Sequence, residues 1–88
     1  MKVLKTVQEI DGEGLESLLG ESVLLMCSSY FYTGTLVGVN DTCVKIENPS
    51  IVYDTGVWGA DNWSDVQRMH VDELYVQVAS IESFCRGR

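Results

Sequence analysis

The chain has 88 residues, of which 45% are hydrophobic and one is proline, and its formal net charge is −7. A chain of this length builds one hydrophobic core, so we expect a single domain over residues 1–88, and the apolar content excludes a disordered chain. Thirteen acidic residues against six basic ones repel phosphate backbones. This balance disfavours non-specific nucleic-acid binding, although a local pocket for a nucleotide stays compatible with it.

The longest apolar run covers residues 23–27, far fewer than a membrane span needs, and the first eleven residues lack the hydrophobic stretch of a signal peptide. We therefore expect a cytoplasmic protein with no membrane segment. Cys27, Cys43 and Cys85 show no CxxC spacing. They are predicted to be reduced packing thiols rather than disulfides or zinc ligands.

Residues 11–20 open the ordered part of the chain. They place Leu15, Leu18 and Leu19 at helical spacing, with acidic residues in the first turn and Gly20 as a stop. The pattern predicts a short amphipathic helix.

The middle of the chain reads as strands. Residues 21–29 and 30–39 are rich in aromatic and β-branched residues, which predicts two consecutive strands. The tetrapeptide at 39–42, VNDT, has turn chemistry. Residues 43–48 then alternate apolar and polar side chains as a half-buried strand does, and Pro49 is expected to bend or break that strand.

The last third is mixed. Residues 55–70 show no clear period and are predicted to be a long loop. Residues 73–84 alternate again, with Tyr75 and Gln77 on the polar face, and the small residues 79–80 divide them into two short strands.

These elements define a mainly β fold: a short N-terminal helix followed by a strongly bent five-stranded antiparallel sheet, an open barrel of the SH3 type. Gly34 and Gly38 mark places where such a sheet can curve. An open barrel keeps edge strands, and pairing these edges between subunits is one way to remove them.

Two segments resemble a known family. The stretch 11–48 is similar to the first motif of Sm-like proteins. Residues 73–84 are similar to the second motif, which also occurs in the bacterial Sm-like RNA chaperone, and residues 49–72 are unmatched. The matching residues of the first motif are Leu15, Leu19, Val23, Leu25, Tyr32, Gly34, Leu36, Val39, Val44 and Ile46.

The resemblance implies a homo-oligomeric ring of about five to eight copies, joined edge to edge, with two turns of each subunit lining the pore and holding single-stranded RNA bases. Carried over to this chain, the first turn is Asn40, Asp41 and Thr42, and the second covers residues 77–80 with Gln77 as its polar member.

This chain departs from the family's turns. Asn40 stands where the family has Asp, Thr42 replaces the stacking residue, Val44 takes the place of Asn, and Gln77 with Val78 replaces Arg-Gly. The lysine-and-histidine turn of the bacterial chaperone is absent too. Hydrogen-bonding groups for base edges are therefore present in the turns, whereas a flat group on which a base can stack is missing.

Catalytic and metal chemistry find little support. His70 is the only histidine and has no second histidine or cysteine nearby for a metal, and no GxSxG pattern occurs. The acidic residues in 61–65 lack the spacing of a calcium loop. We expect no enzyme activity, no metal and no cofactor.

Trp58 and Trp63 lie in the predicted loop at 55–70. Either they fold back over the open edge of the barrel, or they are displayed to a protein partner. Two hypotheses follow: an Sm-like ring that binds single-stranded RNA or a nucleotide, and a scaffold or protein-interaction ring that uses this loop and binds no RNA.

Overall fold

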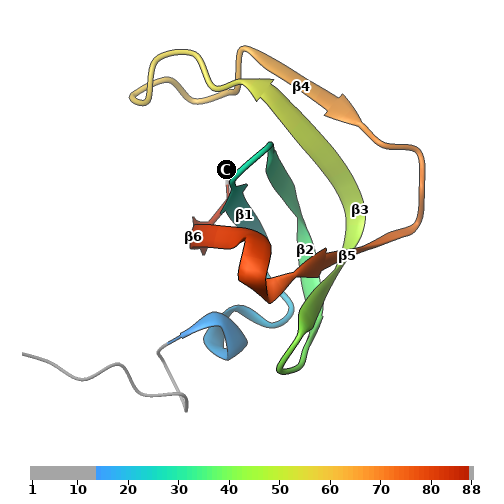
Figure 1. The fold of residues 1–88 in the computed structure, drawn as a ribbon. Coiled ribbons are helices and arrows are strands. Elements are labelled where there is room, and N and C mark those ends of the chain that lie inside the picture. The colour runs from blue at the N-terminus through green and yellow to red at the C-terminus, as the bar shows by residue number, and fades with distance from the viewer. Residues whose placement is uncertain (1–13, 88) are drawn as a thin grey trace, which may run out of the picture.

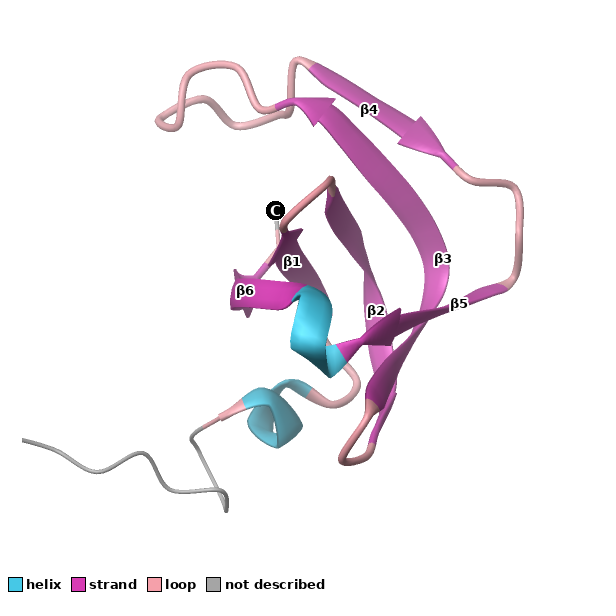
Figure 2. Ribbon diagram, viewed as in Figure 1, coloured by secondary structure: helices cyan, strands magenta, loops and turns pink. Residues whose placement is uncertain are grey.

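The computed structural model describes residues 14–87, which form an antiparallel β-sheet with two short 3-10 helices (Figures 1 and 2). The elements in chain order are η1 (Leu15–Leu18), β1 (Ser22–Cys27), β2 (Phe31–Val39), β3 (Cys43–Asp54), β4 (Asp65–Arg68), β5 (Glu73–Gln77), η2 (Val78–Ser80) and β6 (Ile81–Arg86). Residues 1–13 lie outside the described residues. They contain the start of the predicted helix and the N-terminal segment for which no signal peptide is expected.

The sheet has the strand order β4-β3-β2-β1-β6, and β5 pairs with β3 as well. β3 is long enough to serve two neighbours on one side: residues 43–47 lie opposite β5, and residues 50–54 lie opposite β4. Figure 1 shows β3 as a long curved strand with β4 and β5 beside its two halves. Among the described strands, β4, β5 and β6 therefore each have a neighbour on one side only.

The division of β3 lies at Asn48 and Pro49. Asn48 has a left-handed backbone with φ 50°, and the register with β2 shifts at this point, so β3 carries an extra residue there. The adjoining connection follows the corner, because the Asn48 N–H donates to the Asp72 carbonyl at 3.1 Å and the Met69 N–H donates to the Pro49 carbonyl at 3.1 Å. The predicted effect of Pro49 is confirmed as a bend within one continuous strand.

Gly34 lies opposite this corner on β2. A β-carbon added at Gly34 would come within 2.9 Å of the Glu47 carbonyl oxygen and 3.2 Å of the Ile46 side chain. Only glycine lets the two strands approach this closely, which is a physical reason for the predicted curvature at this position.

The core fills the concave side of the bent sheet. Its fully buried members come from the first three strands and follow the predicted alternation; they are Val23, Leu25, Leu36, Val44 and Ile46. Val76 of β5 and Cys27 of β1 join the same cluster. Leu36 and Ile46 are direct partners across β2 and β3, so the predicted burial of both strands is confirmed.

The predicted helix is shorter and tighter in the structure. Within the described residues it is a single 3-10 turn, closed by the Leu19 N–H donating to the Glu16 carbonyl at 3.2 Å. Leu15 and Leu18 pack against the core, whereas Leu19 is 46% exposed, so its predicted place on the apolar face is wrong. Gly20, with φ 87°, turns the chain into β1 before the helix can continue.

The predicted loop over residues 55–70 is wrong for Asp65–Arg68, which form β4, so the sheet has six strands where five were predicted. All four side chains of β4 are exposed. Because no face of this strand enters the core, it lacks the apolar alternation by which a strand is found in a sequence.

Candidate functional site: a turn-lined groove and a neighbouring pocket

The structure brings the two predicted turns together. Asn40, Asp41 and Thr42 connect β2 to β3, and Val78 begins η2 directly after Gln77. The Val78 N–H donates to the Thr42 carbonyl at 2.9 Å. Gln77 is also the register partner of Cys43, so both turns lie at the same end of the β3–β5 pair.

Asn40 holds the first turn in shape. Its side-chain oxygen accepts hydrogen bonds from the Thr42 N–H at 2.8 Å, the Thr42 hydroxyl at 3.1 Å and the Cys43 N–H at 2.9 Å. This arrangement is an Asx turn, which offers the backbone the bonds that a sheet would otherwise provide. The side-chain oxygen of Asn40 is thus engaged within the turn.

A shallow groove, which we call the turn groove, runs beside the two turns. It is lined by Asp41, Thr42, Cys43, Tyr75, Gln77, Val78 and Ala79. Tyr75 is 62% exposed. An exposed phenol ring is a flat surface on which a base can stack, so the turn groove contains the group that the turn sequences lack.

The role of Tyr75 escaped the sequence reasoning, although the signal was present. Tyr75 alternates with Leu74 and Val76 and therefore shares a strand face with Gln77. The family's stacking residue lies within the turns, whereas the exposed ring in this chain lies on the neighbouring strand β5.

Lys45 lies on the same face, with its Nζ atom 5.6 Å from the centroid of the Tyr75 ring and 2.8 Å from a carboxylate oxygen of Glu73. The hydrogen bond to Glu73 raises the pKa of Lys45, and the charge of Glu73 adds to that effect. Lys45 therefore keeps its charge beside the exposed ring, although Glu73 neutralises much of its field.

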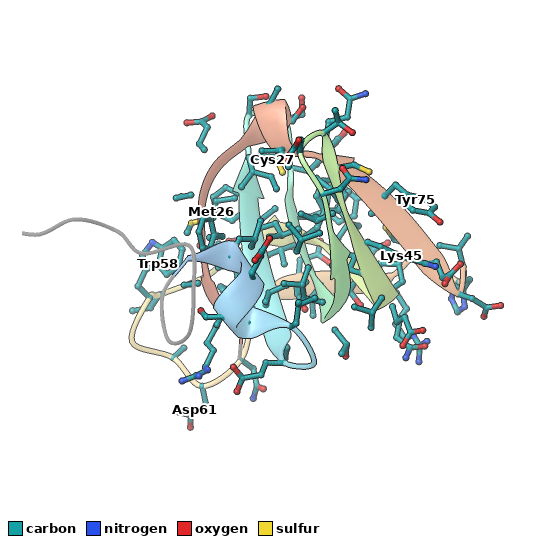
Figure 3. The ribbon with its side chains drawn as sticks, turned by 90° about the horizontal axis from the view of Figure 1, so that it is seen from below. Met26, Cys27, Lys45, Trp58, Asp61 and Tyr75 are labelled. Carbon is teal, nitrogen blue, oxygen red and sulfur yellow. The ribbon has the colours of Figure 1, made fainter. Side chains whose placement is uncertain are left out.

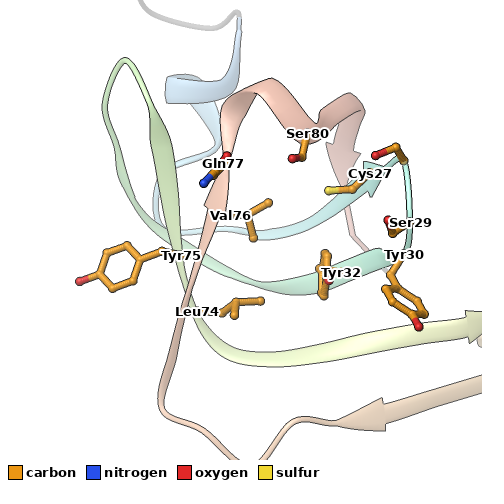
Figure 4. A pocket seen from close by; sticks show the side chains of 10 residues that line it. Cys27, Ser29, Tyr30, Tyr32, Leu74, Tyr75, Val76, Gln77 and Ser80 are labelled. Carbon is orange, nitrogen blue, oxygen red and sulfur yellow. The ribbon is translucent and has the colours of Figure 1, made fainter.

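A smaller pocket of about 200 Å³ lies between β5 and the start of β2 (Figure 4). Leu74 and Val76 of β5 point toward Cys27 and Tyr32 in this view, whereas Tyr75 points away. Burial raises the pKa of the Cys27 thiol, with the Glu82 charge as a smaller cause, and burial also raises the pKa of the Tyr32 phenol. Both groups stay protonated at neutral pH, so neither is an activated nucleophile.

The two tryptophans contact each other in the loop that leads to β4. Their ring centroids are 6.0 Å apart in an edge-to-face arrangement. Trp58 is 60% exposed, while Trp63 is half-buried. Figure 3 shows Trp58 and Asp61 on the side of the molecule away from Tyr75 and Lys45. Trp58 is therefore the more exposed of the two indoles, and both predicted roles of the pair stay predictions.

His70 is exposed, with φ 57°, in the connection between β4 and β5. Residues 14–87 contain no group of three or more His, Cys, Asp or Glu side chains placed to hold a metal ion. In the same range, no helix has the length and apolar character needed to cross a membrane.

Comparisons with family models, with curated proteins and with solved structures gave no match.

Proposed function

We propose that this chain is the subunit of an Sm-like, homo-oligomeric ring without catalytic activity, and that the turn groove binds single-stranded RNA or a nucleotide. The observation that carries the proposal is the pair of open edges at the two ends of the bent sheet, β5 with β4 at one end and β6 at the other. The bend of the sheet and its open edges support the edge-to-edge arrangement that the resemblance implies.

The open edges are suited to association. Each presents unpaired backbone groups together with an exposed apolar side chain: Val66 on β4, Tyr75 on β5 and Phe84 on β6 are exposed by 43%, 62% and 40%. Such edges invite pairing with another chain. Because β5 and β6 are different surfaces, the contact is heterologous, and a heterologous contact that closes on itself makes a ring.

Ligand binding follows from the turn groove. Tyr75 offers a stacking face, and Thr42 and Gln77 offer hydrogen-bonding groups for base edges. In a ring these groups repeat once in each subunit. The net charge of −7 opposes binding through the phosphates, so the expected ligand is a short single strand or a nucleotide held mainly through its bases.

The first test is the absolute mass by size-exclusion chromatography with light scattering. We expect five to eight copies for the native chain and a monomer for Phe84→Lys, because a lysine on an edge strand opposes pairing. The matched control is Val37→Lys, since Val37 is 39% exposed but lies on β2, inside the sheet. A monomeric native chain would refute the ring.

The second test is titration with fluorescent oligo-U and oligo-A. Tyr75→Ala is expected to weaken binding about tenfold, since stacking contributes about 1–3 kcal/mol per base. Tyr75→Phe should bind as the native chain does. A ring that binds neither oligonucleotide would leave the assembly standing and would reject RNA binding.

A second candidate function is a protein-interaction ring that binds no RNA. Trp58 supports it, because exposed tryptophans are frequent anchors at interfaces and this one is 60% exposed. Its direct test is recovery of partner proteins by native chain and by Trp58→Ala, with the mass of the ring as control. Equal recovery by both proteins would reject it.

A further inference from the structure

A second groove lies at the far end of β3, and we call it the aromatic groove. It is lined by Ser29, Tyr30, Phe31, Val52, Tyr53, Asp54, Thr55 and Trp58 and encloses about 450 Å³. The lining residues come from the start of β2, the end of β3 and the loop that follows it. The proposed RNA site makes no use of any of them.

The groove has three exposed rings. Tyr30, Tyr53 and Trp58 are 45%, 53% and 60% exposed. Tyr30 and Tyr53 hold each other edge to face, with centroids 5.8 Å apart. A monomer with a small core gains stability by burying such rings, so three exposed rings lining one groove are a mark of a binding surface.

The groove also has an unbalanced negative charge at one end. Asp54 lies in the groove and is the direct register partner of Asp65 on β4, and both are exposed. Two like charges directly opposite each other destabilise a strand pair. The ion pairs within residues 14–87 are Lys45 with Glu73 and Arg86 with Glu21, so neither Asp54 nor Asp65 has a basic partner there.

We propose that the aromatic groove binds a proline-rich peptide segment in the polyproline II conformation, with an arginine or lysine placed against Asp54 and Asp65. A polyproline II segment has no internal hydrogen bonds, so its carbonyls accept bonds from tyrosine hydroxyls while its proline rings pack on aromatic faces. Its stiffness lowers the entropy lost on binding. The basic residue relieves the repulsion between the two carboxylates.

This inference deepens the second candidate function by naming the class of partner, and it does not require the ring. No lining residue of the aromatic groove belongs to β5 or β6. The groove is therefore not part of a contact between β5 and β6, and peptide binding can be tested in a ring or in a monomer.

The experiment is fluorescence anisotropy of a labelled ten-residue peptide of alternating proline and leucine with an arginine at each end, titrated with the full chain. Two control peptides carry glutamates in place of the arginines, or alanines in place of the prolines. We expect saturable binding of the first peptide and binding at least tenfold weaker for both controls. Higher salt should weaken binding of the arginine peptide, because its charges pair with exposed carboxylates.

Matched variants locate the site. Trp58→Ala and Tyr53→Ala should each weaken binding about tenfold or more, whereas Val71→Ala, which removes an exposed apolar side chain outside the groove, should leave it unchanged. Asp54→Asn should weaken binding of the arginine peptide only and keeps an oxygen to accept the 2.9 Å bond from the Gly56 N–H. Asp61→Asn is its control, because Asp61 is exposed and lies outside the lining.

Several results would overturn the proposal. One is that the arginine peptide does not bind at millimolar concentrations of the chain. Another is that the glutamate or alanine peptide binds as tightly as the arginine peptide. A third is that Trp58→Ala and Tyr53→Ala bind the arginine peptide as the native chain does. A lower assembly mass for Trp58→Ala would make the groove a contact between copies and would overturn it as well. The mass of the native chain, measured on the same sample, reports on the ring separately.

Discussion

Gly34 shows how one missing side chain permits the bend of the sheet. A β-carbon there would lie 2.9 Å from the Glu47 carbonyl oxygen, and this backbone atom has little room to yield. We expect Gly34→Ala to lower the free energy of unfolding by about 1–3 kcal/mol, as overpacking in a well-filled interior does. Gly59→Ala is the control, because nothing lies within 4 Å of its added carbon. Urea unfolding of both variants measures the difference, and equal stabilities would contradict the close approach.

Cys27 gives the molecule a pH dependence on the alkaline side. Burial, with a smaller contribution from Glu82, raises the pKa of its thiol in the folded state. The folded chain therefore keeps a proton that the unfolded chain loses above about pH 8.5, so stability falls as pH rises from there toward the raised pKa.

We expect the urea midpoint of the native chain to fall as the pH rises above about 8.5. Relative to its own midpoint at neutral pH, Cys27→Ala should show a smaller fall. Alkylation by iodoacetamide offers a second readout, since exposed Cys85 should react well before buried Cys27. Reaction of Cys27 at the rate of Cys85 would show that the thiol is not buried.

At the scale of elements, the two strands that pair with the same side of β3 lie next to differently buried parts of it. Val44 and Ile46 are fully buried and lie between β2 and β5, whereas β4 is exposed along its whole length and has a single neighbour. We expect β4 amides to exchange with solvent orders of magnitude faster than those of Val44 and Ile46, because local opening of an exposed edge strand disturbs little packing. Hydrogen exchange followed by NMR measures this, and β1, a central strand, is the internal reference. Equal protection of β4 and β1 in a monomeric sample would contradict it.

The elements also show what a sequence can reveal. Val44 and Ile46 alternate with polar residues, and Leu36 lies in a run rich in aromatic and β-branched residues, so the strands that bury them were predictable. β4 buries nothing and left no pattern. The N-terminal leucines have helical spacing, but Gly20 and the bond from its N–H to the Leu36 carbonyl end the helix after one turn. This contact is long-range and cannot be inferred from local spacing.

The local turn of the candidate site was predictable from the sequence, whereas the contacts between its two turns were not. The turn at Asn40 follows from its own chemistry, and the structure gives that residue three hydrogen bonds inside the turn. The meeting of Thr42 with Val78, and the position of Tyr75 beside both turns, depend on how β3 and β5 pair. The aromatic groove needs residues from β2, from β3 and from the loop after β3, and of the predicted site residues only Trp58 lines it.

For the whole molecule, the net charge of −7 opposes compaction and association. Sodium chloride at about 0.5 M shortens the range of this repulsion to a few ångströms, so we expect a higher urea midpoint and a stronger tendency to assemble than at low salt. Salt should act in the opposite direction on the proposed peptide ligand, because it weakens the binding of a basic peptide to an acidic chain. Thermal or urea unfolding at two salt concentrations, with sucrose at equal osmolality as control, tests the charge effect. A midpoint that falls with salt would show that attractive pairs dominate.

The pairing of β1 with β6 has a consequence for how the chain folds. Leu25 lies opposite Phe84, so this contact closes a loop that contains most of the described chain. Loop closure of this size costs entropy before any contact compensates for it, and sheets with such distant pairings fold in milliseconds to seconds rather than microseconds. The hairpins of β1, β2 and β3 join neighbouring segments and form more readily. Until β6 arrives, the edge of β1 is open to the β6 of any other copy, so refolding at high concentration favours dimers that exchange this strand.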